Sequence, residues 1–175
     1  MTDCPPRVVS REALVTTPWV TLLCKEVASN ENTESYYSLE VPDYVAVVAR
    51  TPSGKVPFVR QYRPAVEEFT LELPAGTLEK GETPEQCCVR ELREEVGLEA
   101  LSVHHTGSHW PDTGRLENLQ HTFLVEASEA DSGIDAELEV VYLTPAEIES
   151  KIRVGEIRAL LHISALYMTG ILPAR

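Results

Sequence analysis

The chain has 175 residues and a formal net charge of −13 at pH 7, a length that suits one well-buried domain with a small appendage. The negative charge argues against binding of nucleic acid through a basic surface, so an anionic substrate would need local positive charge from metal ions and a few arginines. The N-terminal MTDCPPR lacks the apolar core of a secretory signal, and no run of about eighteen apolar residues occurs, which predicts a cytoplasmic protein without a membrane partner.

The first part of the chain consists of short β-type runs separated by turn residues. Strands are expected at residues 8–15, 19–27, 36–41, 44–49, 58–61 and 69–73. Pro52-Ser53-Gly54 is a strong turn signal, and we expect it to close a hairpin between strands near 45–50 and 56–61. Residues 1–42 are predicted to form a small antiparallel sheet of their own, ahead of a main domain at residues 43–175.

A helix is predicted over Pro84–Val96, and the sequence marks both of its ends. Thr83 supplies a capping hydroxyl, and Gln86 completes a capping box. Gly97 can take the left-handed conformation that ends a helix. The apolar stripe that would pack on a sheet consists of Cys88, Val89, Leu92 and Val96.

The rest of the chain returns to strands and ends in helices. Strands are expected near 101–107, 120–127 and 140–143, followed by a helix from the Thr144 cap to about Arg153 and a longer apolar helix at 156–168. This order predicts a mixed α/β fold in which the helix at 84–96 packs on a sheet. The four cysteines are expected to be reduced thiols.

Three carboxylates share the helix stripe next to the apolar one, namely Glu91, Glu94 and Glu95. Like charges three or four positions apart destabilise a helix by roughly 0.2–0.5 kcal/mol per pair, so something must offset their repulsion. One explanation is a solvated acidic face that Arg90 and Arg93 partly neutralise. The other is a metal site, because the loop at 74–82 has two glycines that can take positive φ and can aim a backbone carbonyl at the carboxylates. Oxygen ligands gathered in this way suit Mg²⁺ or Mn²⁺.

Residues 76–98 read GTLEKGETPEQCCVRELREEVGL. The fixed positions are Gly76, Glu82 after five residues, and Arg90-Glu91-Leu92-x-Glu94-Glu95-x-Gly97-Leu98 after seven more. In this spacing the segment resembles the Nudix box, the signature of hydrolases that cleave nucleoside diphosphates linked to another group. Two earlier segments are similar to the ADP-ribose pyrophosphatase branch of that family: Arg60-Gln61-Tyr62-Arg63-Pro64 and Glu72-Leu73-Pro74-Ala75-Gly76.

The resemblance implies a fold, a reaction and a partner. The fold is a Nudix α/β/α sandwich with a mixed sheet, and the N-terminal sheet would build a homodimer and part of the substrate pocket. The reaction is Mg²⁺-dependent hydrolysis, with Mn²⁺ as an alternative ion, of ADP-ribose or another nucleoside diphosphate sugar to a nucleoside monophosphate and a sugar phosphate. Two alternatives remain open: a Nudix hydrolase of dinucleoside polyphosphates, coenzyme A or capped RNA, and a module that binds a nucleotide sugar without cleaving it.

The resemblance also implies roles for the box residues. The metal ligands would be the side chains of Glu91 and Glu95 and the backbone carbonyl of Ala75. Glu94 would be a third or bridging ligand. Glu82 would support the site from the loop, and Arg90 would orient a glutamate or touch phosphate.

The resemblance to the ADP-ribose branch implies a general base in a later loop, at 131–139. Glu137 is the preferred residue, with Asp135 and Glu139 as alternatives in the same segment. A box glutamate, Glu94 or Glu95, could serve instead, or the three loop acids could be solvated charges only.

The resemblance also implies that Arg60 and Arg63 hold the phosphates, a task that suits a guanidinium fork. The alternative is a pair of surface arginines beside Glu67 and Glu68.

The remaining substrate contacts are predicted in two segments, with Trp19, Arg115 and Glu117 as the candidates. Trp19 would stack on the nucleobase, although core or dimer packing explains it equally well. The segment His109-Trp110-Pro111-Asp112-Thr113-Gly114-Arg115 resembles a substrate loop of ADP-ribose hydrolases but has Thr113 where a second proline is usual. Asn118 stands where that loop has an acid, with Glu117 beside it. The sugar and the base therefore stay open.

Overall fold

The computed structural model describes residues 5–30, 32–128 and 136–173. The chain divides into two compact units, which are Met1–Asp43 with Trp110–Leu119, and Tyr44–His109 with Gln120–Arg175. No helix in the described ranges is long and apolar enough to cross a membrane.

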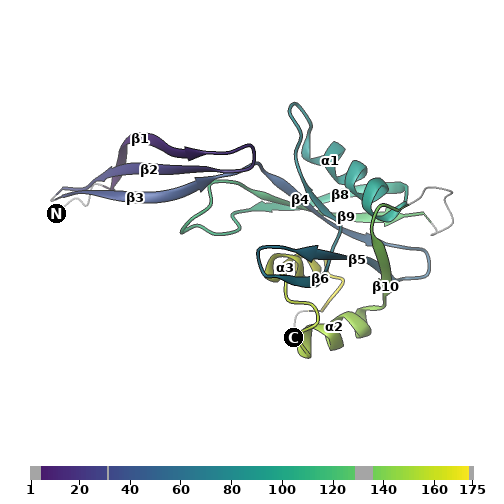
Figure 1. Cartoon of the computed structure of the whole chain (residues 1–175). Helices are drawn as coiled ribbons and strands as arrows, with labels where there is room; N and C mark the ends of the chain where they lie inside the picture. Colours follow the sequence, from purple (N-terminus) through teal and green to yellow (C-terminus); the bar gives the residue numbers. More distant parts are fainter. Residues whose placement is uncertain (1–4, 31, 129–135, 174–175) are drawn as a thin grey trace. The chain divides into compact units, whose positions relative to one another are not determined.

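The N-terminal unit is an antiparallel sheet of three strands in the order β1-β2-β3 (Figure 1). These strands span Arg7–Thr16, Thr21–Ala28 and Thr33–Glu40. The segment from residue 110 to residue 119 joins the sheet at Leu39, whose N–H donates to the Arg115 carbonyl at 2.8 Å and whose carbonyl accepts from the Glu117 N–H at 3.2 Å. The predicted small N-terminal antiparallel sheet is confirmed, and the contribution of the later segment to it was not foreseen.

The second unit contains two sheets. The four-stranded sheet has the order β7-β4-β9-β8, formed by Ala75–Thr77, Tyr44–Arg50, Gln120–Ala127 and Ala100–His109. The three-stranded sheet has the order β10-β5-β6, formed by Glu139–Leu143, Val56–Arg63 and Glu68–Glu72. Strands β4 and β9 run parallel while the other pairs are antiparallel, so the larger sheet is mixed, as expected.

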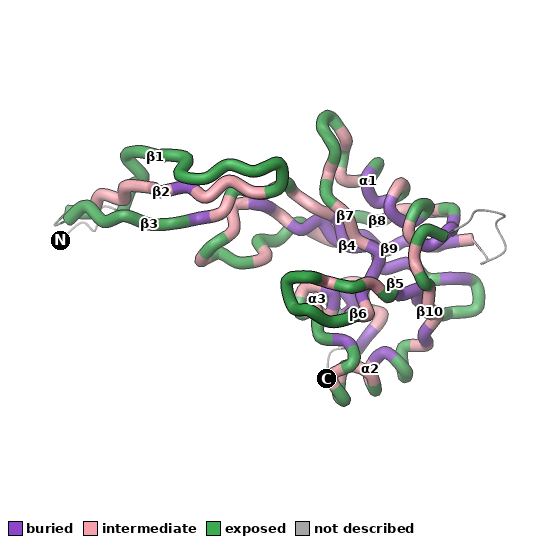
Figure 2. Tube along the Cα trace, viewed as in Figure 1, coloured by how far each residue is buried: buried purple, intermediate pink, exposed green. Residues whose placement is uncertain are grey.

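Helices cover the sheets on two sides, which makes the α/β/α sandwich (Figures 1 and 2). They are α1 (Pro84–Glu91) with its continuation η1 (Leu92–Val96), α2 (Pro145–Arg153) and α3 (Leu160–Met168). Val45 and Val47 of β4 pack in the core under α1, while Ala46 and Val48 pack in the core under α2 and α3. Alternate residues of a strand point to opposite faces, so β4 is the buried centre of both cores.

The predicted hairpin at Pro52-Ser53-Gly54 is wrong in one respect. The turn exists, because the Thr51 N–H donates to the Lys55 carbonyl at 2.9 Å. However, β4 and β5 belong to different sheets. Strand β4 already pairs with β7 on one edge and β9 on the other, so it has no edge for β5.

The box helix begins and ends where the sequence predicted, but its last turn is a π-helix rather than an α-helix. Gly97 ends it with a left-handed φ of 74°. The predicted apolar stripe needs one correction, because Cys87 is fully buried while Val89 is 36% exposed. The thiols of Cys24, Cys87 and Cys88 are free, as expected.

The last helix begins later than expected. The N–H groups of Glu156 and Ile157 both donate to the Lys151 carbonyl and complete the end of α2. Gly155, at a φ of 76°, turns the chain there. Residues 156–159 therefore connect the two helices, and α3 starts only at Leu160.

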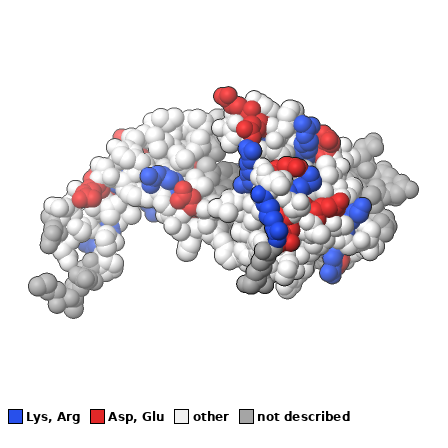
Figure 3. Space-filling model, turned by 90° about the horizontal axis from the view of Figure 1, so that it is seen from below, with Lys and Arg blue, Asp and Glu red and all other residues white. Residues whose placement is uncertain are grey.

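Charges of opposite sign are paired on the surface of the second unit. Arg158 contacts Glu68 at 2.9 Å and Arg153 contacts Glu149 at 2.9 Å. On the face drawn in Figure 3, basic and acidic side chains of this unit lie close to one another.

Candidate active site

The Nudix-box loop and helix meet at Gly76. A Cβ atom added to Gly76 would lie 1.8 Å from Oε1 of Glu91, so no larger residue fits without moving that carboxylate. Of the two loop glycines that were expected to take positive φ, Gly81 does so at 86°, whereas Gly76 does not and is needed for space. Glu91 itself is only 8% exposed, which excludes a solvated acidic face as its environment.

Arg90 holds three box carboxylates. Its Nε and Nη2 atoms donate to the two oxygens of Glu82 at 2.8 and 3.0 Å. Its Nη1 atom donates to Glu91 at 2.7 Å and to Glu94 at 3.1 Å. The hydrogen bonds that Arg90 donates to Glu82 lower the pKa of the Glu82 carboxyl to about 2. The guanidinium thus offsets the repulsion among the glutamates, while Arg93 lies 3.9 Å from Glu99.

Glu95 is tied to the loop before the box helix. Its Oε2 atom accepts a hydrogen bond from the Ala75 N–H at 2.9 Å. Burial raises the pKa of Glu95 to about 7, and although the bond from Ala75 works in the other direction, the nearby Glu91 carboxylate adds to the rise. Burial also raises the pKa of Glu91. A buried and a partly buried carboxylate that repel each other would be stabilised by a shared cation.

The box carboxylates can be compared with the ligands that Mg²⁺ usually has in proteins. Within the ranges that the structure describes, no three His, Cys, Asp or Glu side chains converge as a ready-made cage. Mg²⁺ usually binds through one or two carboxylates and completes its shell with waters and substrate phosphates. Glu91 and Glu95 fit that pattern, while Glu94 is more exposed and turned toward Arg90. The assignment of individual metal ligands stays a prediction.

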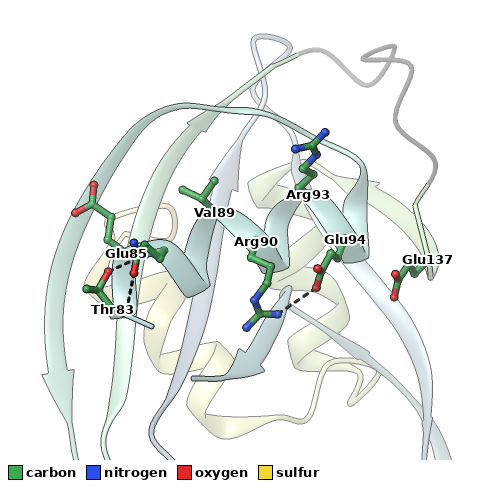
Figure 4. A pocket seen from close by; sticks show the side chains of 8 residues that line it. Thr83, Glu85, Val89, Arg90, Arg93, Glu94 and Glu137 are labelled. Atoms are coloured by element: carbon green, nitrogen blue, oxygen red, sulfur yellow. Dashed lines mark hydrogen bonds and ion pairs between the residues drawn. The ribbon is translucent and has the colours of Figure 1, made fainter. Parts of the chain in front are cut away.

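Glu137 lies beside the box helix. Its N–H donates to the Glu94 carbonyl at 2.9 Å. Together with Arg90, Arg93, Glu94 and the exposed Val89 it lines an open groove of about 880 Å³ (Figure 4). The groove therefore places the preferred base next to one of the predicted ligands.

Glu139, one of the two alternatives to Glu137, lies in a different environment. Glu139 pairs with Arg60 at 3.1 Å. Its neighbour Val141 packs in the core under α2 and α3, whereas Val140 packs under the box helix, so the side chain of Glu139 points away from the box helix. Asp135 lies outside the described residues.

Arg60 and Arg63 point to opposite faces of the three-stranded sheet, because they are three positions apart on β5. Arg63 forms a fork with buried Glu72, at 3.0 and 2.8 Å, and acts electrostatically on Glu95. Arg60 instead lies 4.2 Å from the ring centre of Phe69 and pairs with Glu139. The structure thus brings Arg63 to the carboxylates but not Arg60. The ion pairs of both arginines, with Glu72 and Glu139, also differ from the alternative that placed them beside Glu67 and Glu68.

A buried polar group behind the site was missed by the sequence analysis. Glu72 accepts hydrogen bonds from Arg63 and from Thr70, which, against the effect of burial, lower the pKa of its carboxyl. His162 of α3 is 5% exposed, and its Nδ1 atom lies 3.9 Å from Glu72. Glu72 is the one acid in the predicted strand 69–73, and this was the available signal for it, whereas His162 is distant in sequence and gave none.

The three remaining candidates for substrate contacts, Trp19, Arg115 and Glu117, all lie in the first unit. Trp19 is 80% exposed and borders a hollow of about 330 Å³. Arg115 is exposed, and its Nη1 atom donates to the Gly114 carbonyl. Glu117 is bound by Lys25, Ser38 and Arg11, and the hydrogen bond from Lys25 leads the lowering of its pKa. Its side chain thus attaches the segment 110–119 to the sheet, a role that the sequence did not suggest.

Asn118, which stands where related substrate loops have an acid, is also engaged internally. It is buried, and its side-chain amide donates to the Pro42 carbonyl at 3.0 Å.

Comparison with known proteins agrees with this geometry. The NUDIX domain profile matches residues 41–162. The chain is 41% identical over 85 residues to an ADP-ribose pyrophosphatase of Bacillus subtilis, an alignment that covers 49% of this chain and 46% of that protein. It is 32% identical over 97 residues to an ADP-sugar pyrophosphatase of Mus musculus, covering 55% of this chain and 44% of the mouse protein.

A third relative carries a different name. The methanol dehydrogenase activator of Bacillus methanolicus is 36% identical over 97 residues, covering 54% of this chain and 52% of that protein. In each case the aligned part is about half the length of the curated relative. The family match, by contrast, extends over most of this chain and includes the whole carboxylate site. The chain therefore belongs to the Nudix family.

Proposed function

We propose that the protein is a metal-dependent pyrophosphatase that cleaves the diphosphate linkage of ADP-ribose or another nucleoside diphosphate sugar. The products would be a nucleoside monophosphate and a sugar phosphate. The observation that carries the proposal is the pair of carboxylates packed against the backbone of Gly76 and Ala75, namely buried Glu91 and partly buried Glu95. The choice of substrate rests on the names of the relatives, two of which are an ADP-ribose and an ADP-sugar pyrophosphatase.

The residues that would hold Mg²⁺ or Mn²⁺ are Glu91, Glu95, Glu94 and the Ala75 carbonyl. When bound, the ion would neutralise phosphate charge and lower the pKa of an attacking water. Arg90 keeps Glu82, Glu91 and Glu94 together around one guanidinium. This arrangement limits how far the carboxylates must move when a cation arrives.

Phosphate binding is proposed for Arg63. Glu72 takes its Nε and Nη2 atoms, which orients the guanidinium and leaves Nη1 for a phosphate oxygen. A guanidinium that is fixed in this way loses little side-chain entropy when it binds. Arg60 could reach substrate only from the other face of its sheet, so we assign it a weaker part in binding.

Glu137 is proposed as the general base. Its position beside Glu94 supports this choice, and proton transfer by a correctly placed carboxylate is the usual task of such a residue. Glu94 is the competing candidate, because it borders the same groove.

We also propose that the N-terminal sheet forms a homodimer. Its strands expose six large apolar side chains, namely Val8, Val9, Leu14, Val15, Tyr36 and Tyr37. These residues are neighbours in pairs along β1 and β3, so exposed apolar side chains lie on both faces of the sheet. Exposed apolar patches can mark interfaces, and a second copy of the chain would cover one of these faces. The contributions of Trp19, Arg115 and Glu117 to substrate binding stay predictions.

The experiment is a panel of diphosphates incubated with Mg²⁺ or Mn²⁺, with phosphate-coupled detection of products. It should contain ADP-ribose, other nucleoside diphosphate sugars, a dinucleoside polyphosphate and coenzyme A. Glu95→Gln should abolish turnover, while Glu99→Gln, an exposed acid near the same helix, should not alter it. If no diphosphate sugar is cleaved, the proposal fails; tight binding of one without cleavage would support the sensing module instead.

A further inference from the structure

The chain segment that leads into the Nudix box is held at three successive residues by three different elements. The Leu73 N–H donates to Nδ1 of His162 on α3 at 3.1 Å. The Pro74 carbonyl accepts from the Val47 N–H of β4 at 2.9 Å. The Ala75 N–H donates to Oε2 of Glu95 at 2.9 Å. The peptide units before Gly76 are therefore fixed between the last helix, the central strand and the box helix.

His162 is suited to hold one end of this segment. It is 5% exposed, and the charged groups that act on it are Glu72, whose Oε2 lies 3.9 Å from Nδ1, and Arg63. Because Nδ1 accepts the Leu73 hydrogen bond, the ring proton of the neutral form lies on Nε2. Burial lowers the pKa of His162 to about 4, so the ring remains an acceptor at neutral pH.

The hydrogen bond from Leu73 to His162 lies close enough in the chain to the Ala75–Glu95 bond to affect it. Proline has no N–H, so Leu73 carries the last amide donor before that of Ala75. A buried amide that loses its acceptor carries a free-energy cost, and the segment would move to recover a partner. Only Pro74 separates Leu73 from Ala75, so such a shift would reach the bond to Glu95.

We propose that His162 is a positioning residue for metal binding, which holds Leu73 so that the Ala75 backbone and the Glu95 carboxylate keep their relative geometry. This inference rests on the proposed function, in which Glu95 and the Ala75 carbonyl are metal ligands. The bond from Ala75 occupies Oε2 of Glu95 and leaves Oε1 for the cation. Residues outside the ligand set that orient ligands typically change metal affinity by about 10- to 100-fold when they are mutated.

The test compares three variants of the full chain with the wild type. His162→Leu removes the acceptor but keeps the volume. His162→Asn places a carbonyl oxygen close to the position of Nδ1, and His162→Gln places one farther out. Binding of Mn²⁺ is measured by electron paramagnetic resonance, and KM is measured at saturating metal.

The expected result is a Kd for Mn²⁺ that rises about 10- to 100-fold in His162→Leu and His162→Gln, with KM unchanged at saturating metal. His162→Asn should restore affinity. A merely structural role would lower the thermal midpoint without this recovery. Equal Mn²⁺ affinity in wild type and a folded His162→Gln would overturn the proposal, and this comparison decides the matter even if His162→Leu does not fold.

Hydrogen exchange of the metal-free protein separates this inference from the proposed function. The amides of Leu73 and Ala75 should exchange faster in His162→Leu or His162→Gln than in the wild type, and His162→Asn should restore their protection. If wild type binds no Mn²⁺ but this pattern holds, the assigned metal site is wrong while the backbone role of His162 stands. Unchanged protection at Ala75 would overturn the positioning role itself.

Discussion

The backbone N–H of Glu137 donates to the carbonyl of Glu94 at 2.9 Å, so an acid from a late loop is fixed to the helix that carries the box carboxylates. Because the bond is made by the backbone, the Glu137 side chain is not needed to maintain it. Its carboxylate borders the groove along the box helix (Figure 4).

This relationship predicts the effect of Glu137→Gln. Removal of a general base typically lowers kcat by about 10²- to 10⁴-fold, while the thermal midpoint should stay near that of wild type. The matched control is Glu139→Gln, since Glu139 faces Arg60 on the other side of the sheet. If the two variants lose activity equally, the assignment of the base to Glu137 is wrong.

Gly76→Ala should damage both stability and activity. The new Cβ atom would lie 1.8 Å from the Glu91 carboxylate, and overpacking of this kind costs about 1–3 kcal/mol of unfolding free energy. We expect weaker Mg²⁺ activation as well, because the displaced group is a predicted ligand. Denaturant unfolding and metal titration of turnover measure the two effects.

Gly54→Ala is the control for a general penalty on replacing glycine. Gly54 has a φ of 77°, and nothing lies within 4 Å of an added Cβ atom. Strain alone should cost this variant about 1–2 kcal/mol, and its metal dependence should remain normal. Normal metal activation in Gly76→Ala would contradict the close packing of Glu91 against the loop.

The buried His162 predicts a specific dependence of stability on pH. Burial holds its folded-state pKa at about 4, below the value of about 6.5 for an unfolded chain. Between these values the unfolded state binds more protons, so the contribution of this residue to stability is present above about pH 6.5 and is lost as pH falls toward 4. The expected loss is about 3 kcal/mol.

The measurement is a difference between wild type and His162→Asn, which cannot titrate in this range. The free energy of unfolding of wild type minus that of His162→Asn should fall by about 3 kcal/mol between about pH 6.5 and pH 4, because other groups titrate alike in both. Parallel curves across that range would show that His162 is not buried in its neutral form.

The exposed apolar residues of the N-terminal sheet predict a dimer that dissociates when one charged side chain is introduced on this sheet. Val15 is 55% exposed on β1, and Val15→Asp should shift the mass measured by light scattering from dimer to monomer. Val154→Asp, at a position that is 67% exposed after α2, should leave the mass unchanged. A monomeric wild type would refute the proposed interface.

Local signals in the sequence were sufficient for the box helix. The capping box of Thr83 and Gln86 and the left-handed Gly97 lie where they were predicted, because each depends only on residues within one helical turn. The π-helical last turn was not predicted from these signals.

The features that could not be predicted from the sequence are mostly contacts between residues far apart in the chain and the pairing of strands. Arg63 lies opposite Glu68 in the register of β5 and β6 but binds Glu72. His162 meets Leu73 across 89 positions in the chain. The predicted hairpin failed for the same reason, because the partners of β4 come from β7 and β9. Residue spacing cannot reveal which strands become neighbours.

The central claim is that Glu95 belongs to a metal site that directs water to a diphosphate. The most direct measurement is turnover of ADP-ribose with Mg²⁺ in water enriched in heavy oxygen, for wild type and Glu95→Gln, with mass analysis of both products. The account predicts that wild type places the label in the phosphate of one product and that Glu95→Gln gives no product. Product formation by Glu95→Gln at the wild-type rate, or label outside the phosphate groups, would contradict it.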